Sequence, residues 1–286
     1  MGNSTSAAAA GSPSQDKSSV VISRVFPSSA DYRLYVTPQS YVFFENSRPD
    51  AAANTTIAIC LPGIGDTRRQ FRLLAPLLHD RLGFRVLVGD LRGFGDSASF
   101  EDNEEDDYST YSPEAIASDV AKLMKELKSA DPSCSFVLLG NSLSAGAMVL
   151  VAATAKKADA DFCIRSLVLL GPMLRDYPIE QWFRPLTYLL FRPLYGAWVW
   201  GVYYRTLYPG KGEWSSALGD LAGIPDLPVL AFFGRKDPDF FDLDGELEWF
   251  HATVPHALRF EDEEGGHYPH LENPVRVIQA IEESLA

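Results

Sequence analysis

The sequence predicts an α/β fold, in which helices cover both faces of a mostly parallel central sheet. Short apolar runs alternate along the chain with stretches whose apolar residues recur at helical spacing, and this alternation is typical of such a fold. Several of the apolar runs are continuous, as expected of strands that are buried on both faces. The chain has 286 residues, 46% of them hydrophobic, which is enough to bury a large core.

Apolar runs that end at turn residues predict the strands, and helical periodicity predicts the helices. The predicted strands are 20–26, 34–36, 41–44, 56–61, 84–88, 136–139, 166–170, 228–233 and 258–260. Helices are predicted over 69–78, from Ser112-Pro113 onward, over 145–153 and over 274–285. Serine followed by proline is typical of a helix start, because serine can cap the helix and proline needs no partner in its first turn.

Charge and cysteine content exclude several classes of function. The net charge of −13 argues against nucleic acid or an anionic membrane as the main partner. Cys60, Cys134 and Cys163 have no CxxC spacing, so neither a zinc site nor a disulfide framework is predicted, and a reducing, cytoplasmic location is expected. The acidic run 101–107 lacks the alternating ligands and glycine turn of a calcium loop, which favours a solvated surface insertion.

The N-terminal segment 1–19 is rich in Ser, Ala and Gly and is predicted to be disordered, without the pattern of a secretory signal. Its first six residues match the N-myristoylation pattern, with Gly2 as the acceptor and Ser6 four residues later. The alternative is an unmodified start that happens to begin Met-Gly. Because one myristoyl chain binds only marginally and no second anchor is present, the pattern predicts at most weak, reversible membrane association.

The stretch Gly140-Asn-Ser142-Leu-Ser144 joins a predicted strand to a predicted helix. A serine with small residues two positions to either side fits a nucleophile elbow, a sharp turn that lifts the hydroxyl above the sheet edge. The second small residue is Ser144, where glycine is usual. On the pentapeptide alone, an ordinary turn with a capping serine remains the alternative.

A serine nucleophile needs a neighbouring base. Among the five histidines, His267 and His270 follow the last predicted strand, and the carboxyl ends of strands are where α/β sheets place reactive groups. Gly265-Gly266 lets the backbone bend so that an imidazole can reach over the sheet. His267 is favoured as the base over His270.

The base in turn needs an orienting acid, and Asp237 follows the predicted strand 228–233. There it would hold the imidazole tautomer and stabilise its cation. Asp239 is the alternative acid. Three further aspartates are expected to have structural or peripheral roles: Asp90, Asp96 and Asp176.

Five sequence blocks in order resemble the α/β-hydrolase superfamily, in its serine-nucleophile branch. They are 61–65, 90–96, 140–144, 234–237 and 266–267, and the resemblance covers residues from about 56 to 286. The order Ser142, Asp237, His267 is that of the family's triad. The resemblance implies an oxyanion hole built from the backbone N–H groups of Leu143 and Ile64, with Gly65 as the alternative to Ile64, and it implies no cofactor or metal. A serine at the elbow also disfavours the dehalogenase-like and epoxide-hydrolase-like reactions, which use aspartate there.

The resemblance divides the chain into a hydrolase core, residues 20–171 and 228–286, and a short helical cap insertion at 172–227. In the segment 182–208, 10 of 27 residues are aromatic. Its arginines and its short charge-free run exclude a membrane span. These aromatics are expected either to pack on the sheet core or to form an apolar roof over Ser142.

Together these features predict a serine hydrolase that cleaves a small-molecule carboxylic ester or thioester with an apolar acyl or aryl part through an acyl-enzyme. A C–C hydrolase, lactonase, amidase or acyltransferase could use the same triad. The alternative from another class is a catalytically silent, membrane-proximal interaction protein.

Overall fold

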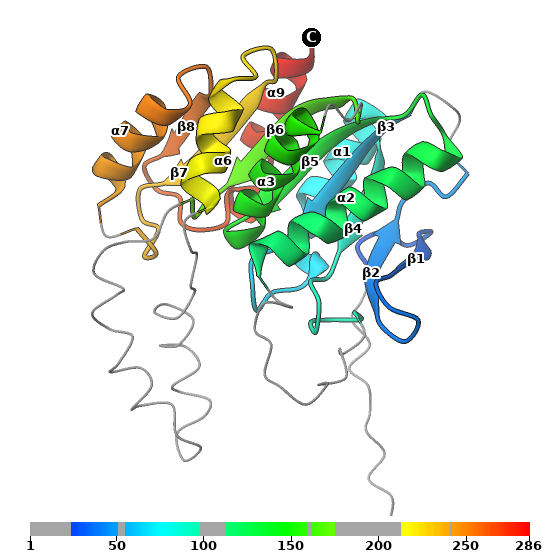
Figure 1. The fold of residues 1–286 in the computed structure, drawn as a ribbon. Helices are drawn as coiled ribbons and strands as arrows, with labels where there is room; N and C mark the ends of the chain where they lie inside the picture. The colour runs from blue at the N-terminus through cyan, green and yellow to red at the C-terminus, as the bar shows by residue number, and fades with distance from the viewer. Residues whose placement is uncertain (1–23, 51–54, 98–111, 159–161, 175–212, 241) are drawn as a thin grey trace, which may run out of the picture.

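The computed structural model describes residues 24–50, 55–97, 112–158, 162–174, 213–240 and 242–286. This part of the chain contains one eight-stranded sheet in the order β1-β2-β4-β3-β5-β6-β7-β8 (Figure 1). β1 and β2 pair antiparallel with each other, and β2 pairs antiparallel with β4, whereas all the pairs from β4 to β8 are parallel. The strands are β1 (Ala30–Tyr35), β2 (Tyr41–Asn46), β3 (Thr56–Leu61), β4 (Arg85–Gly89), β5 (Ser135–Asn141), β6 (Ile164–Leu170), β7 (Val229–Gly234) and β8 (Leu258–Asp262).

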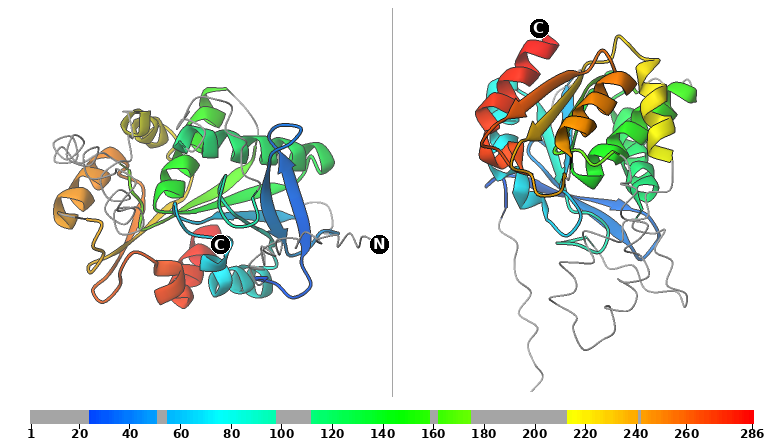
Figure 2. Two further views of the ribbon diagram at one scale, coloured as in Figure 1. Left: turned by 90° about the horizontal axis from the view of Figure 1, so that it is seen from below. Right: turned by 90° about the vertical axis from the view of Figure 1, so that its left-hand side faces the viewer.

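Helices cover both faces of the sheet, which confirms the predicted fold class (Figure 2). α1 (Leu74–Leu82) and α9 (Pro274–Leu285) pack on one face. The other face is covered by α2 (Pro113–Ala130), α3 (Leu143–Lys157), α6 (Glu213–Ala222) and α7 (Leu243–Thr253). Two short elements, the 3-10 helix η1 (Arg68–Arg72) and α8 (Pro269–Glu272), follow the loops after β3 and β8. None of the described helices is long and apolar enough to cross a bilayer.

The central strand β5 shows why its apolar run is continuous. Phe136 and Leu138 point into the core beneath α2 and α3, whereas Val137 and Leu139 point into the core beneath α1 and α9. Successive side chains of a strand face opposite sides, so a strand covered on both faces needs apolar residues at every position. The helix cap predicted at Ser112 is also present, because its side chain accepts a hydrogen bond from the backbone N–H of Ala115.

The prediction of a strand over 20–26 is wrong where the structure describes it. Val25 and Phe26 form a bend, and the first strand begins at Ala30. The cause is Glu45 on β2, whose carboxylate accepts hydrogen bonds from the backbone N–H groups of Val25 and Phe26 at 3.0 and 2.5 Å. Both donors are therefore unavailable to a strand ladder. The predicted helix over 69–78 is likewise divided, with η1 preceding α1.

Several sequence predictions lie outside the described residues: the N-terminal segment 1–19, the acidic run 101–107 and the aromatic segment 182–208. The described end of the predicted cap insertion contains α6, which packs on α3 through Ala217, Leu218 and Leu221. The boundaries of the cap remain a prediction.

The buried guanidinium of Arg68 connects η1 with β2 and with the loop after β4. Arg68 is only 2% exposed, and it contacts Glu45 at 3.3 Å, Asp96 at 2.6 Å and Asp90. Its backbone N–H also donates to Asp90 at 2.7 Å, and its guanidinium lies 4.6 Å from the centre of the Phe43 ring. These contacts join η1 to β2 and to the loop after β4.

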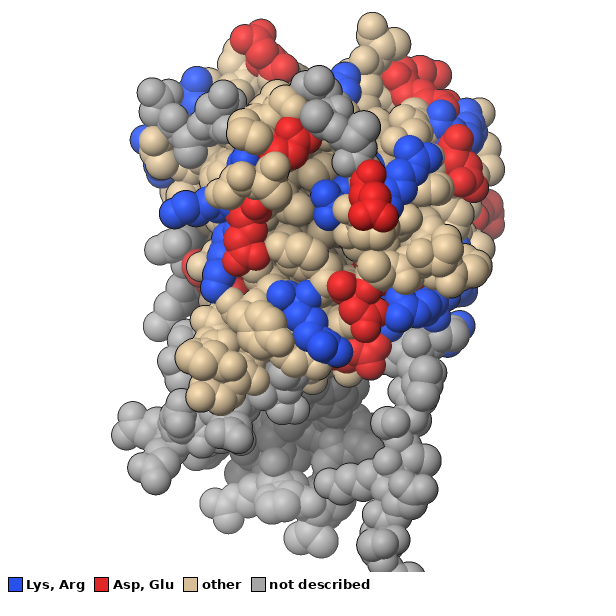
Figure 3. Space-filling model, turned by 90° about the vertical axis from the view of Figure 1, so that its right-hand side faces the viewer, with Lys and Arg blue, Asp and Glu red and all other residues tan. Residues whose placement is uncertain are grey.

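Charged side chains on the outer surface, unlike Arg68, Glu45 and Asp90, are exposed to water. On the face shown in Figure 3, basic and acidic residues are interspersed and do not gather into a patch of one sign. In the ion pair between Arg24 and Asp31, both side chains are more than 40% exposed to solvent. Such pairs contribute little to stability, because water competes for both charges.

We expect Arg68→Met to lower the free energy of unfolding by about 3–5 kcal/mol, because it leaves the carboxylates of Glu45 and Asp90 buried without their cation. Urea unfolding followed by circular dichroism measures this loss. The matched variant Arg24→Met breaks the exposed pair and should cost less than about 1 kcal/mol. Equal losses in the two variants would contradict a stabilising role for the buried network.

Candidate active site

The sequence-predicted site residues lie in loops that leave one edge of the sheet. β3, β5, β7 and β8 run in the same direction, so their carboxyl ends meet at that edge. The loop after β3 contains Ile64, Ser142 follows β5 directly, Asp237 follows β7, and His267 follows β8. In open α/β sheets this edge is where ligands bind.

The backbone at Ser142 has the conformation of a sharp, strained turn. Its φ is 55° and its ψ is −121°, and it is one of two non-glycine residues with positive φ in the described part of the chain. A non-glycine residue pays roughly 1–3 kcal/mol for such a conformation, which persists only where the surroundings enforce it. The Ser142 N–H donates to the carbonyl of Leu170 at 2.9 Å, and α3 begins at the next residue.

Close packing around the turn explains its small residues. A Cβ at Gly140 would lie 2.4 Å from the carbonyl oxygen of Ser144, so no side chain fits there. Ser144 takes the place where glycine is usual, and its hydroxyl donates to the carbonyl of Pro62 at 2.5 Å. A Cβ at Gly63 would lie 3.2 Å from the Cβ of Ser142. The loop after β3 therefore passes directly beside Ser142.

The structure brings Asp237 and His267 together. Nδ1 of His267 lies 2.7 Å from Oδ2 of Asp237, and both side chains are almost fully buried. This contact places the imidazole proton on Nδ1, which leaves Nε2 as a proton acceptor. Asp239 has its Oδ2 3.5 Å from the same Nδ1, while its backbone N–H donates to Oδ1 of Asp237 at 2.9 Å.

Three carboxylates surround His267 and change its pKa. Burial by itself lowers the pKa of His267, because it disfavours the charged imidazolium. The hydrogen bond that Nδ1–H donates to Asp237 and the charges of Asp237, Asp239 and Asp66 outweigh this effect. The pKa of His267 therefore lies above its ordinary value of 6.5.

Ser142 and His267 are linked through Asn141. The Asn141 Nδ2 donates to the backbone carbonyls of Leu170 at 2.8 Å and of His267 at 3.0 Å. Among the described contacts, Ser142 Oγ and His267 are not hydrogen-bonded to each other. Serine–histidine bonds of this kind are often long before substrate binds.

The candidate oxyanion donors belong to the start of α3 and to the loop after β3. Leu143 is the first residue of α3, and the first N–H groups of a helix have no partner within it. Ile64 and Gly65 lie in the loop that passes Ser142, where Gly65 has a φ of 83°. The choice between Ile64 and Gly65 as the second donor remains a prediction.

The alternative base, His270, lies in the core. Its ring stacks on Phe71 with centroids 4.7 Å apart, and neither ring nitrogen has a hydrogen-bond partner among the described residues. Burial lowers the pKa of His270 to about 3, with a further contribution from His267 and Arg72. His270 is thus a neutral packing residue.

Two of the other aspartates considered from the sequence contact a buried arginine. Asp90 and Asp96 bind Arg68, as expected of structural residues, and Asp176 lies outside the described residues. Sequence analysis missed Asp66, whose carboxylate lies 3.3 Å from the hydroxyl of Tyr268. Its position after a glycine-bearing loop was the available signal.

A metal could compete for the same groups. Asp237, Asp239 and His267 form the one set of three donor side chains in the described part of the chain whose ligand atoms lie within 4.8 Å of one another. A metal ligand at Nδ1 must be deprotonated, whereas the bond to Asp237 uses the Nδ1 proton. His267 Nδ1 therefore cannot bind a metal and donate a hydrogen bond to Asp237 at the same time.

The family model described as "Alpha/beta hydrolase family" matches residues 58–280, which is most of the chain. This chain belongs to the alpha/beta hydrolase family. The match includes the elbow, the Asp237 loop and the His267 loop, and it confirms the resemblance inferred from the five sequence blocks. None of the curated proteins matches the sequence.

Solved structures share the fold of this alpha/beta hydrolase over nearly its whole length. A thioesterase domain from the curacin biosynthetic pathway is 17% identical with a TM-score of 0.62, covering 89% of this chain and 99% of that domain. A thermophilic esterase from Thermogutta terrifontis is 23% identical with a TM-score of 0.60, covering 90% and 97%. An alpha/beta hydrolase from Novosphingobium aromaticivorans DSM 12444 is 20% identical with a TM-score of 0.62, covering 90% and 98%.

We expect the imidazole of His267 to titrate above 6.5 in NMR experiments, and Asp239→Asn to lower its pKa by removing one of the charges that raise it. Because the folded-state pKa is raised, the stability that this group contributes is present below pH 6.5 and is lost as pH rises through the raised value. Asp244→Asn, which removes an exposed carboxylate after β7, should leave the titration unchanged. A His267 pKa that is the same in Asp239→Asn and wild type would contradict this origin of the shift.

Proposed function

We propose that this alpha/beta hydrolase cleaves carboxylic esters or thioesters with Ser142 as nucleophile, His267 as general base and Asp237 as the orienting acid. The observation that carries the proposal is the 2.7 Å contact between His267 Nδ1 and Asp237 Oδ2, at the same sheet edge as the strained turn of Ser142. A serine on such a turn and an imidazole that keeps its proton on Nδ1, both at one edge of the sheet, are parts that nucleophilic catalysis needs.

In the proposed reaction, Ser142 Oγ attacks the acyl carbonyl and its proton passes to Nε2 of His267. Asp237 holds the Nδ1 proton and stabilises the imidazolium that forms. Backbone N–H groups of Leu143 and of Ile64 or Gly65 would bind the oxyanion, each donor being worth about 3 kcal/mol in such sites. His267 then gives its proton to the leaving group, and water hydrolyses the acyl-enzyme by the reverse sequence of proton transfers.

The raised pKa of His267 matters for this reaction. A carboxylate at Nδ1 makes Nε2 a better proton acceptor, and two further carboxylates stabilise the imidazolium. The base works only when it is neutral, so hydrolysis should fall as pH drops through the raised pKa.

We infer a small-molecule substrate with an apolar acyl or aryl part from the aromatic segment 182–208, in which 10 of 27 residues are aromatic. The names of the thioesterase domain and the esterase with the same fold are consistent with acyl transfer to water. A C–C hydrolase, lactonase, amidase or acyltransferase remains an alternative on the same triad, and a substrate panel separates these reactions.

A cytoplasmic location is part of the proposal. Cys60, Cys134 and Cys163 are all free thiols, which agrees with a reducing compartment. Weak, reversible membrane association would require myristoylation of Gly2, and mass spectrometry of the N-terminal peptide tests for it.

We expect a fluorophosphonate probe to label the wild-type protein and to fail on Ser142→Ala, because only an activated serine attacks the probe at a useful rate. His267→Ala should reduce the labelling rate by at least about a hundredfold. The measurement is the labelled fraction over time by intact-protein mass spectrometry, followed by hydrolysis of aryl esters and acyl thioesters of increasing chain length.

Ser129→Ala is the matched control, because it removes a serine hydroxyl on the exposed side of α2 and should leave labelling unchanged. Folded wild-type protein that does not label would contradict the proposed mechanism and favour a catalytically silent interaction protein. Labelling without ester or thioester turnover would favour one of the other acyl-transfer reactions.

A further inference from the structure

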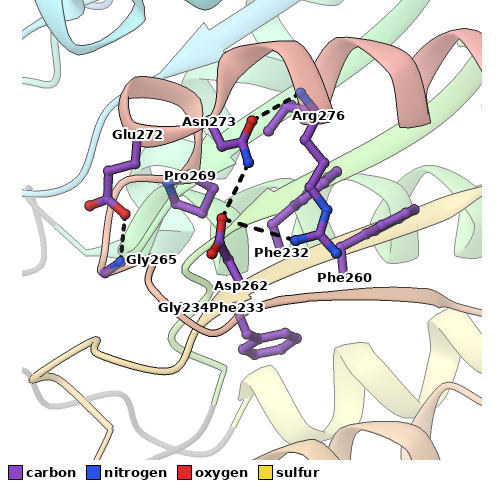
Figure 4. Close-up of a pocket in the computed structure, with 12 residues that line it drawn as sticks. Phe232, Phe233, Gly234, Phe260, Asp262, Gly265, Pro269, Glu272, Asn273 and Arg276 are labelled. Atoms are coloured by element: carbon purple, nitrogen blue, oxygen red, sulfur yellow. Dashed lines mark hydrogen bonds and ion pairs between the residues drawn. The ribbon is translucent and has the colours of Figure 1, made fainter.

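The loop that carries His267 is bound from outside by Glu272 of α8. One carboxylate oxygen of Glu272 accepts from the backbone N–H of Gly266 at 2.5 Å, and the other lies 3.3 Å from the N–H of Tyr268. Figure 4 shows this side chain directed back at the loop. The two peptide N–H groups that flank His267 along the chain are therefore held by one side chain.

The carbonyl of the same residue is bound from inside by Asn141. Asn141 is fully buried, and its Nδ2 donates to the carbonyl oxygens of His267 at 3.0 Å and Leu170 at 2.8 Å. Because both partners are carbonyl oxygens, which only accept, the amide nitrogen of Asn141 must point toward them. This requirement fixes the orientation of the Asn141 side chain. Asn141 directly precedes Ser142 and binds the backbone of His267. This one residue therefore constrains the position of the candidate base relative to the candidate nucleophile.

Neighbouring contacts hold the base of this loop. Arg276 donates to the carbonyl of Glu261 at 2.7 Å. Asn273 donates to Asp262 at 3.3 Å, a contact marked in Figure 4. The pocket that Asp262, Asn273 and Arg276 help to line has room for about one water molecule. It is therefore a packing gap beneath the loop and too small for a substrate.

We propose that Asn141 and Glu272 are positioning residues, which hold the backbone of His267 from two sides so that its imidazole meets Ser142. The inference rests on the proposed function, since it assigns the two residues to the geometry of that triad. Asp237 binds the ring and selects its tautomer. Asn141 and Glu272 set where the ring stands, and a displacement of about 1 Å at a reacting group can cost a hundredfold in rate.

The test compares the rate constant of fluorophosphonate labelling with the final labelled fraction. Asn141→Ala and Glu272→Ala should each lower the rate constant by about tenfold or more, while the final fraction stays at that of wild type. Glu272→Gln keeps one acceptor oxygen and should have an intermediate rate. A residue that only stabilises the fold would lower the final fraction and leave the rate constant of the folded molecules unchanged.

Glu263→Gln is the matched control for Glu272→Gln, because it makes the same chemical change in the same loop at a side chain that is 83% exposed. Its labelling rate should equal that of wild type. Wild-type rate constants in both Asn141→Ala and Glu272→Ala, or losses confined to the final fraction, would overturn the inference and leave the triad standing. Failure of folded wild-type protein to label would overturn the triad and the inference with it.

Discussion

The site depends on the backbone of Ser142, which is held at a φ of 55° where a side chain is normally disfavoured. The turn is sharp enough that a Cβ at Gly140 would lie 2.5 Å from the N–H nitrogen of Ala145. Three kinds of contact enforce it. Ser142 bonds to the end of β6, Ser144 bonds to Pro62 in the loop after β3, and α3 packs on the sheet immediately behind the turn. The strained backbone of Ser142 is therefore held in place by neighbouring parts of the parallel sheet and by α3.

Carboxylates occur in two different environments at this edge of the sheet. Asp90 and Glu45 are fully buried against the permanently charged guanidinium of Arg68, so their charges are already compensated and stabilise the loop geometry. Asp237 instead faces an imidazole, which can gain or lose a proton near neutral pH. The same type of side chain thus has a structural role in one place and is suited to proton transfer in the other, because the partner differs.

Chain separation explains which parts of the site were difficult to predict. The bond between Asn141 and His267 joins residues 126 positions apart, and that between Asp66 and Tyr268 joins residues 202 positions apart. Neither has a local pattern. The wrong strand prediction over 24–26 has the same origin, since its backbone donors bond to Glu45 on a later strand. The side chain that captures them is apparent only when β2 is in place.

Local order of residues determined the fold class and the candidate triad. A continuous apolar run is favoured only where a strand is covered on both faces, and small residues on both sides of Ser142 are needed wherever a strand turns sharply into a helix. Tertiary structure decided what lies beside the imidazole: Asp237 at hydrogen-bonding distance, Asp239 slightly farther away, and His270 turned into the core against Phe71. Periodicity and spacing record burial and backbone shape, whereas the partners of a buried charged or polar group depend on how distant loops meet at the edge of the sheet.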